Sequence, residues 1–253
     1  MQWLLKLFGE ESPVGRFLNQ MFVIVASNLL FVLFSAPVVT IGASLSALNY
    51  TLMKYRRGDR HFKVASMFWK GFKESFVKAT VCFVVYGLLM LFQALEISWC
   101  RQFTGPVALF QYALIGLMVL ETIVAVYLFP VIAAFNGGIG ELLKNALYFA
   151  FSKPHCMLLC VALYVGPLAA TYASIRYLPL WAFLWLLFAF AAIVYLASGI
   201  MLRQFMPFLP EVDICGDIIP PDMEGDPNIM VGEDQSSDDV DEKTLQEMMK
   251  YGL

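Results

Sequence analysis

The stretch that decides the fold is Phe17–Ala36, FLNQMFVIVASNLLFVLFSA, which is followed directly by Pro37-Val-Val-Thr-Ile-Gly42. These 20 residues carry no charged side chain. As an α-helix they would rise roughly 30 Å, which is the thickness of one hydrocarbon core. Pro37 cannot continue such a helix, and a glycine follows closely. The sequence therefore predicts a membrane-spanning helix that ends in a bend.

The composition of the whole chain agrees with this beginning. Of 253 residues, 60% are hydrophobic and 15% are charged, and the mean hydropathy is +0.70. Soluble domains average roughly 45–50% apolar and about 25% charged residues. An ordinary soluble domain is therefore excluded, and an integral membrane protein is expected.

Further apolar runs follow the first span. A run at Ala43–Tyr55 has only 13 residues, so it is either a short returning helix or a re-entrant segment. The later runs are long enough to cross a bilayer, and they cover Ala79–Ser98, Val107–Ile132, Cys156–Ile175 and Leu180–Leu202. The predicted fold is an all-α, polytopic membrane protein with about six membrane helices, or five if the short run does not return.

A basic stretch separates the short run from the next span. Its aromatic residues fall at helical spacing beside the spans, which indicates a helix on the cytoplasmic membrane surface and not a nucleic-acid site. Of the 17 Lys and Arg residues, 15 lie inside when both termini are cytoplasmic, which is the orientation that we predict. The expected basic surface consists of Arg56, Arg57, Arg60, Lys63, Lys70 and Lys73.

The charge is divided unevenly along the chain. Residues 1–210 carry 15 basic and 7 acidic side chains, and residues 211–253 carry 2 basic and 13 acidic ones. We therefore expect a helical membrane domain over 1–210 and a disordered, acidic cytoplasmic tail over 211–253. The tail either docks on a basic surface of this chain or of a partner, or it stays solvated.

Four polar side chains within the spans are candidate intramembrane sites. Glu121 lies near the middle of a span, where it is either a proton or substrate site or a neutral carboxyl that is hydrogen-bonded across helices. Glu96 lies near an outer end, where it can pair with Arg101. Asn28 and Asn49 can bridge helices through their amides, or bind a ligand.

Motifs for catalysis are missing from the sequence. It has two histidines, no HExxH, no GxSxG and no Walker A sequence, and its five cysteines form no CxxC pair. We therefore expect no catalytic residue, no cofactor and no metal site, and we predict that the protein is not an enzyme.

The segment Asn28–Ala43, together with the basic loop and Phe68–Phe76, resembles the YesL-like family of small bacterial membrane proteins of unknown function. The most specific part is the Pro-x-x-Thr-Ile-Gly element, with Pro37, Thr40 and Gly42 at its bend, followed by Lys144-Asn145-Ala146. The resemblance covers about residues 1–210. It implies no catalytic residues, and it implies an accessory role in carbohydrate uptake by ABC transporters.

Two functional hypotheses follow. The first is a non-catalytic accessory or assembly subunit for carbohydrate ABC uptake in the bacterial cytoplasmic membrane, with the lipid bilayer and a permease subunit or a second copy as partners. The second is a small secondary transporter or channel that uses Glu121.

Overall fold

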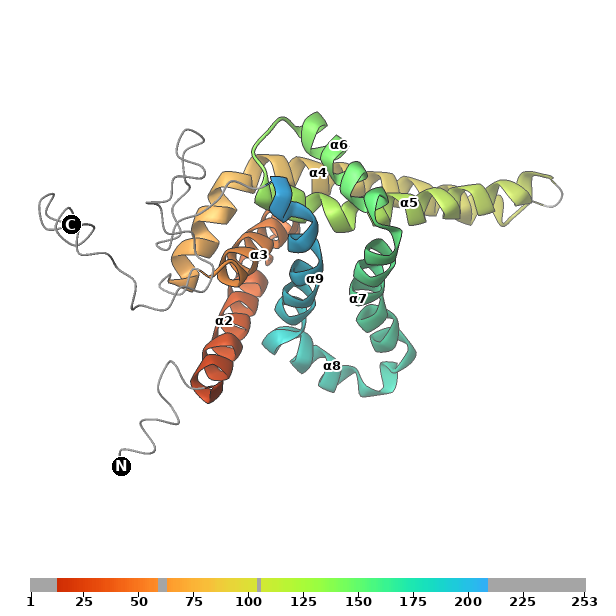
Figure 1. The fold of residues 1–253 in the computed structure, drawn as a ribbon. Coiled ribbons are helices and arrows are strands. Elements are labelled where there is room, and N and C mark those ends of the chain that lie inside the picture. Colours follow the sequence, from red (N-terminus) through yellow and green to blue (C-terminus); the bar gives the residue numbers. More distant parts are fainter. Residues whose placement is uncertain (1–12, 59–62, 104–105, 209–253) are drawn as a thin grey trace, which may run out of the picture. The chain divides into compact units, whose positions relative to one another are not determined.

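The computed structural model describes residues 13–58, 63–103 and 106–208, and all regular elements in these ranges are helices (Figure 1). The all-α prediction is thus confirmed for this part of the chain. The main helices are α2 (Pro13–Phe34), α3 (Ile41–Arg56), α4 (Val64–Cys100), α5 (Pro106–Ala134), α6 (Ile139–Ser152), α7 (Pro154–Ala173), α8 (Leu178–Leu184) and α9 (Phe190–Phe205).

Short helical turns complete these elements. They are η1 (Val38–Thr40), η2 (Ile175–Tyr177), the π-helical η3 (Trp185–Ala189) and η4 (Met206–Phe208). The helices discussed below belong to one compact unit, which ends at Pro207. The predicted acidic tail and Arg60 lie outside the described residues, and the division after residue 210 stays a prediction.

Five helical segments in the described ranges are long and apolar enough to cross a membrane. They match the five long spans predicted from the sequence, and they cover Val14–Phe34, Val64–Cys100, Leu109–Ala134, Pro154–Ala173 and Leu178–Phe208. The predicted short run is the helix α3, which has 16 residues and rises about 24 Å. That is less than one hydrocarbon core, so a crossing by α3 stays a prediction.

The chain turns at Pro37, as the sequence predicts. Helix α2 ends at Phe34, and Pro37 adopts an extended conformation (φ −75°, ψ 118°) before the single turn η1. The Thr40 hydroxyl lies 2.7 Å from the carbonyl oxygens of both Phe34 and Pro37, to which it donates. Thr40 therefore provides a donor for the Phe34 carbonyl oxygen, which the end of α2 leaves without a helical partner.

Helix α3 is the buried centre of this unit. It contacts α2, α4, α5 and α9, and Figure 1 shows it among α2, α4 and α9. Its buried residues include Gly42, Ala43, Ser44, Ser46 and Ala47. Small side chains let the backbones of neighbouring helices approach closely. The neighbouring helices can therefore cover α3, although it is shorter than the spans.

Two glycines permit the closest approach between α3 and α4. A Cβ atom on Gly42 would lie 2.5 Å from the Ala79 carbonyl oxygen. On α4, a Cβ atom on Gly71 would lie 2.8 Å from the Tyr50 ring. Because real Cβ contacts are longer than these distances, both positions accept only glycine without a shift of the helices.

The basic stretch and the following span form one helix. The 37-residue α4 runs from Val64 to Cys100 without a break, although the sequence suggested a surface helix followed by a span. No proline interrupts this range, so nothing in the backbone ends the helix. Near its start, Phe68 and Phe72 pack with Phe34 of α2, with ring centroids 5.6 and 5.1 Å apart.

The close approach at Gly42 yields a stability prediction. Gly42→Ala should lower the free energy of unfolding by about 1–3 kcal/mol, because the added methyl group overlaps the Ala79 carbonyl and forces α3 away from α4. Thermal unfolding of the detergent-purified protein measures this effect. The matched control is Gly87→Ala on α4, where nothing lies within 4 Å of the added Cβ. An unchanged melting temperature in Gly42→Ala would contradict the packing described above.

Candidate functional site

Asn28 is fully buried and joins α2 to the last long helical segment. Its Nδ2 donates to the carbonyl oxygens of Trp185 and Leu186 at 3.1 and 2.7 Å, and its Oδ1 accepts from the Ala191 N–H at 2.9 Å. These backbone groups lie in and just after the π-helical turn η3, where the regular α-helical hydrogen-bond ladder is interrupted. Asn28 therefore bridges helices, which is the packing role considered from the sequence.

Glu121 contacts a polar partner on the neighbouring helix. Gln93 of α4 donates from Nε2 to Oε1 of Glu121 on α5 at 2.7 Å. Nearby, the hydroxyls of Tyr86 and Thr122 lie 3.3 Å apart across the same two helices. The carboxyl group thus takes part in helix packing, as one of the two sequence interpretations requires.

Two buried acceptors remain at this contact. Glu121 Oε2 and Gln93 Oε1 have no hydrogen-bond partner among the described residues. One proton placed on the carboxyl group would give it a donor. This leaves the second interpretation of Glu121, a proton or substrate site, as a prediction.

The sequence did not reveal Gln93 as the partner of Glu121. The pairing depends on the register of α4 against α5, that is, on which residues of the two helices lie side by side. This register is also seen in an apolar cluster of the same two helices, which consists of Ile97, Cys100, Leu114 and Met118. Cys100 ends α4, but it contacts a residue in the third turn of α5.

The other two intramembrane candidates differ in their surroundings. Glu96 is partly exposed and forms no ion pair with Arg101, so the predicted pairing is not found in this part of the chain. Asn49 is fully buried on α3 and donates to the Leu45 carbonyl at 2.8 Å, within its own helix. Its Oδ1 has no hydrogen-bond partner among the described residues, although the Tyr164 side chain of α7 lies near the Asn49 side chain.

A second buried polar cluster lies between α5, α7 and α9, and the sequence analysis missed it. The Tyr127 hydroxyl faces the Cys160 thiol and the Gln204 amide, and all three side chains are buried. The hydroxyl and both amide atoms lack hydrogen-bond partners within the described ranges. The only sequence signal was one polar or thiol side chain within about two turns of one end of each helix, and that signal is too general to identify a cluster.

The predicted basic surface divides into two groups. Arg56 connects α3 to α9 by two contacts. Its Nε donates to the Tyr195 carbonyl oxygen at 3.0 Å, and its guanidinium carbon lies 3.8 Å from the Tyr195 ring centroid. Arg57 is half-buried, and this loss of solvent lowers its pKa. Arg56 is exposed in spite of these contacts, and the lysines Lys63, Lys70 and Lys73 are exposed as well.

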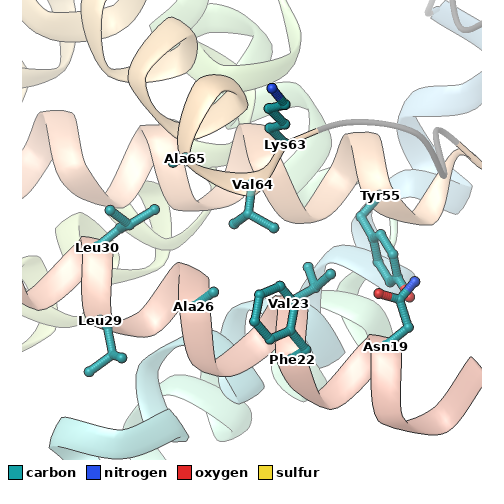
Figure 2. A pocket seen from close by; sticks show the side chains of 10 residues that line it. All are labelled: Asn19, Phe22, Val23, Ala26, Leu29, Leu30, Tyr55, Lys63, Val64 and Ala65. Atoms are coloured by element: carbon teal, nitrogen blue, oxygen red, sulfur yellow. The ribbon is translucent and has the colours of Figure 1, made fainter. Parts of the chain in front are cut away.

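A cavity of about 620 Å³ opens beside this surface (Figure 2). One face of α2 forms most of its wall, with Tyr55 of α3 and the start of α4 completing it. Its lining residues are Asn19, Phe22, Val23, Ala26, Leu29, Leu30, Tyr55, Lys63, Val64 and Ala65.

The long apolar helices and the polar contacts between them define an α-helical membrane protein. The family model of a protein of unknown function, DUF624, matches residues 24–97. The uncharacterized protein YesL of Bacillus subtilis (strain 168) is 25% identical over 178 residues, which cover 69% of this chain and 84% of that protein. No solved structure matches. The two matches support the resemblance seen in the sequence, because this chain is similar both to the DUF624 model and to YesL.

The matched segment has a clear structural meaning. Residues 24–97 run from α2 through α4, so they include the Pro37 bend, the Thr40 hydrogen bonds and the Gly42 contact. Glu121 lies outside this segment. The family-like element Pro37, Thr40 and Gly42 therefore acts on the turn and on helix packing in this structure.

The Asn28 contacts lead to a test of the buried polar groups. Asn28→Leu should lower stability by roughly 1–3 kcal/mol, because the Ala191 N–H and two carbonyl oxygens lose their partner. Tyr127→Phe should change stability by less than about 1 kcal/mol, because its buried hydroxyl has no partner among the described residues. Melting temperatures in one detergent compare the two variants. Equal losses would contradict the different roles assigned to these side chains.

Proposed function

We propose that this protein is a non-catalytic accessory or assembly subunit of a carbohydrate ABC uptake system in the bacterial cytoplasmic membrane. The resemblance to the YesL-like family supports this role, as does the lack of catalytic and ATPase motifs in the sequence. The positive-inside distribution of Lys and Arg supports cytoplasmic N- and C-termini.

The observation that carries the proposal is the use of polar groups inside the spans. Asn28 and the Gln93–Glu121 pair connect the chain's own helices, and the outward faces of the spans are apolar. On α7, Leu158, Leu159 and Leu168 are exposed, and on α4 Leu88 and Leu95 are exposed. Such faces suit lipid or the apolar helices of a permease subunit or a second copy.

The alternative is a small secondary transporter or channel that uses Glu121. The buried oxygens Glu121 Oε2 and Gln93 Oε1, which lack partners among the described residues, favour it. An intramembrane carboxyl group with a free acceptor is a candidate proton site. The two proposals differ in whether Glu121 is required for flux or only for packing.

Copurification tests the first proposal. The tagged full-length protein, extracted from its native membrane in mild detergent, should recover permease or ATPase subunits of a sugar transporter, detected by mass spectrometry. Glu121→Gln should recover them equally, because the substituted amide oxygen can still accept from Gln93. Deletion of residues 211–253 should reduce recovery if the acidic tail docks on the partner. The same purification is repeated from membranes that are chemically crosslinked before extraction, so that weak complexes are retained. Recovery of the protein alone from these membranes would contradict the accessory role.

Flux measurements test the alternative. In liposomes that contain a pH-sensitive dye, the accessory proposal predicts no proton flux above that of empty liposomes. A proton-coupled carrier or channel would give flux that Glu121→Gln abolishes and that Glu96→Gln, a matched control on the partly exposed carboxyl group, leaves unchanged. Flux that survives Glu121→Gln would remove the proposed role of this residue.

A further inference from the structure

The cavity beside α2 has the size and the wall of a ligand pocket. Its volume of about 620 Å³ lies within the roughly 300–1,000 Å³ that is usual for small-molecule sites. Phe22, Val23, Leu29 and Leu30 make one side of it apolar. The opposite side comes from the start of α4, with Val64 and Ala65.

The polar residues of the cavity are separated from its apolar part. Figure 2 shows Asn19 and Tyr55 together at one end, with Leu29 and Leu30 at the other end. Lys63 rises beside Val64 at the rim, and its side chain is exposed. An apolar slot with polar groups at one end and a cation at the rim is complementary to an anionic amphiphile.

The position of the cavity identifies the source of this amphiphile. Six of the ten lining residues belong to α2, which is long and apolar enough to cross a bilayer. Water does not fill apolar cavities well, whereas lipid chains surround a spanning helix. Lys63 directly precedes α4, which also exposes Lys70 and Lys73, and lysines at a membrane surface attract anionic lipids.

We propose that this cavity binds one acyl chain of an anionic phospholipid from the cytoplasmic leaflet, with the Lys63 ammonium group beside the lipid headgroup. Asn19 and Tyr55 supply the polar wall near the glycerol region, and Phe22, Leu29 and Leu30 surround the chain. The site does not depend on the accessory role proposed above. It places the middle of α2, the end of α3 and the start of α4 against one lipid molecule.

Native mass spectrometry of the full-length protein tests the proposal. After delipidation, the protein is titrated with phosphatidylglycerol or with phosphatidylcholine of identical chains. The unmodified protein should bind one phosphatidylglycerol in preference to phosphatidylcholine. Lys63→Gln should reduce this preference about fivefold, since one lysine near an anionic surface contributes about 1 kcal/mol. Lys144→Gln, at an exposed lysine on α6 outside the cavity, is the matched control.

A second pair of variants tests the apolar part of the cavity. Ala65→Trp places an indole ring in the space for the chain and should abolish the single bound lipid of either type. Ser66→Trp adds the same ring at the adjacent exposed position, which does not line the cavity, and should leave binding unchanged. Circular dichroism establishes that each variant is folded, and a variant that is not folded is replaced by Ala26→Phe. Equal binding of both lipids, or binding that survives Ala65→Trp in the folded protein, would overturn the proposal, as would occupation by a second copy of the chain.

Discussion

The close contact between α3 and α4 is the constraint on which the rest of this structure depends. Gly42 lies against the Ala79 carbonyl, and Gly71 lies against the Tyr50 ring, so at both positions one helix contributes no side chain to the contact. This contact helps to bury α3, a 16-residue helix whose buried residues include several small polar side chains. Helices α2, α5 and α9 then pack around α3. The bend at Pro37 reverses the direction of the chain after α2, and α3 can therefore pack between its neighbours.

The polar groups inside the membrane domain differ in how completely they are satisfied. Asn28 uses both its donor and its acceptor on the backbone around η3, which makes it a structural bridge. Gln93 and Glu121 form one hydrogen bond but leave one oxygen each without a partner in the described chain. In an apolar environment such an oxygen is costly. A proton or a polar ligand that supplies a hydrogen bond to such an oxygen would remove this cost.

The positively charged surface also serves two purposes. Arg56 is taken up by the contact between α3 and α9, where it stacks on Tyr195 and binds its carbonyl. Lys63, Lys70 and Lys73 remain exposed along α4, and Lys63 borders the apolar cavity. Basic residues that look alike in the sequence are therefore divided between helix packing and an exposed surface.

The sequence by itself determined the helical class, the five long apolar segments and the turn at Pro37, because hydropathy and proline act locally along the chain. Only the tertiary structure decided which polar residues meet. The register of α4 on α5 brings Gln93 to Glu121, and the π-helical turn that Asn28 completes is 157 residues away in sequence. Apolar helices in a membrane can rotate and slide with little change in hydropathy. Their register is therefore fixed by side-chain packing and hydrogen bonds between distant segments, which no local pattern encodes.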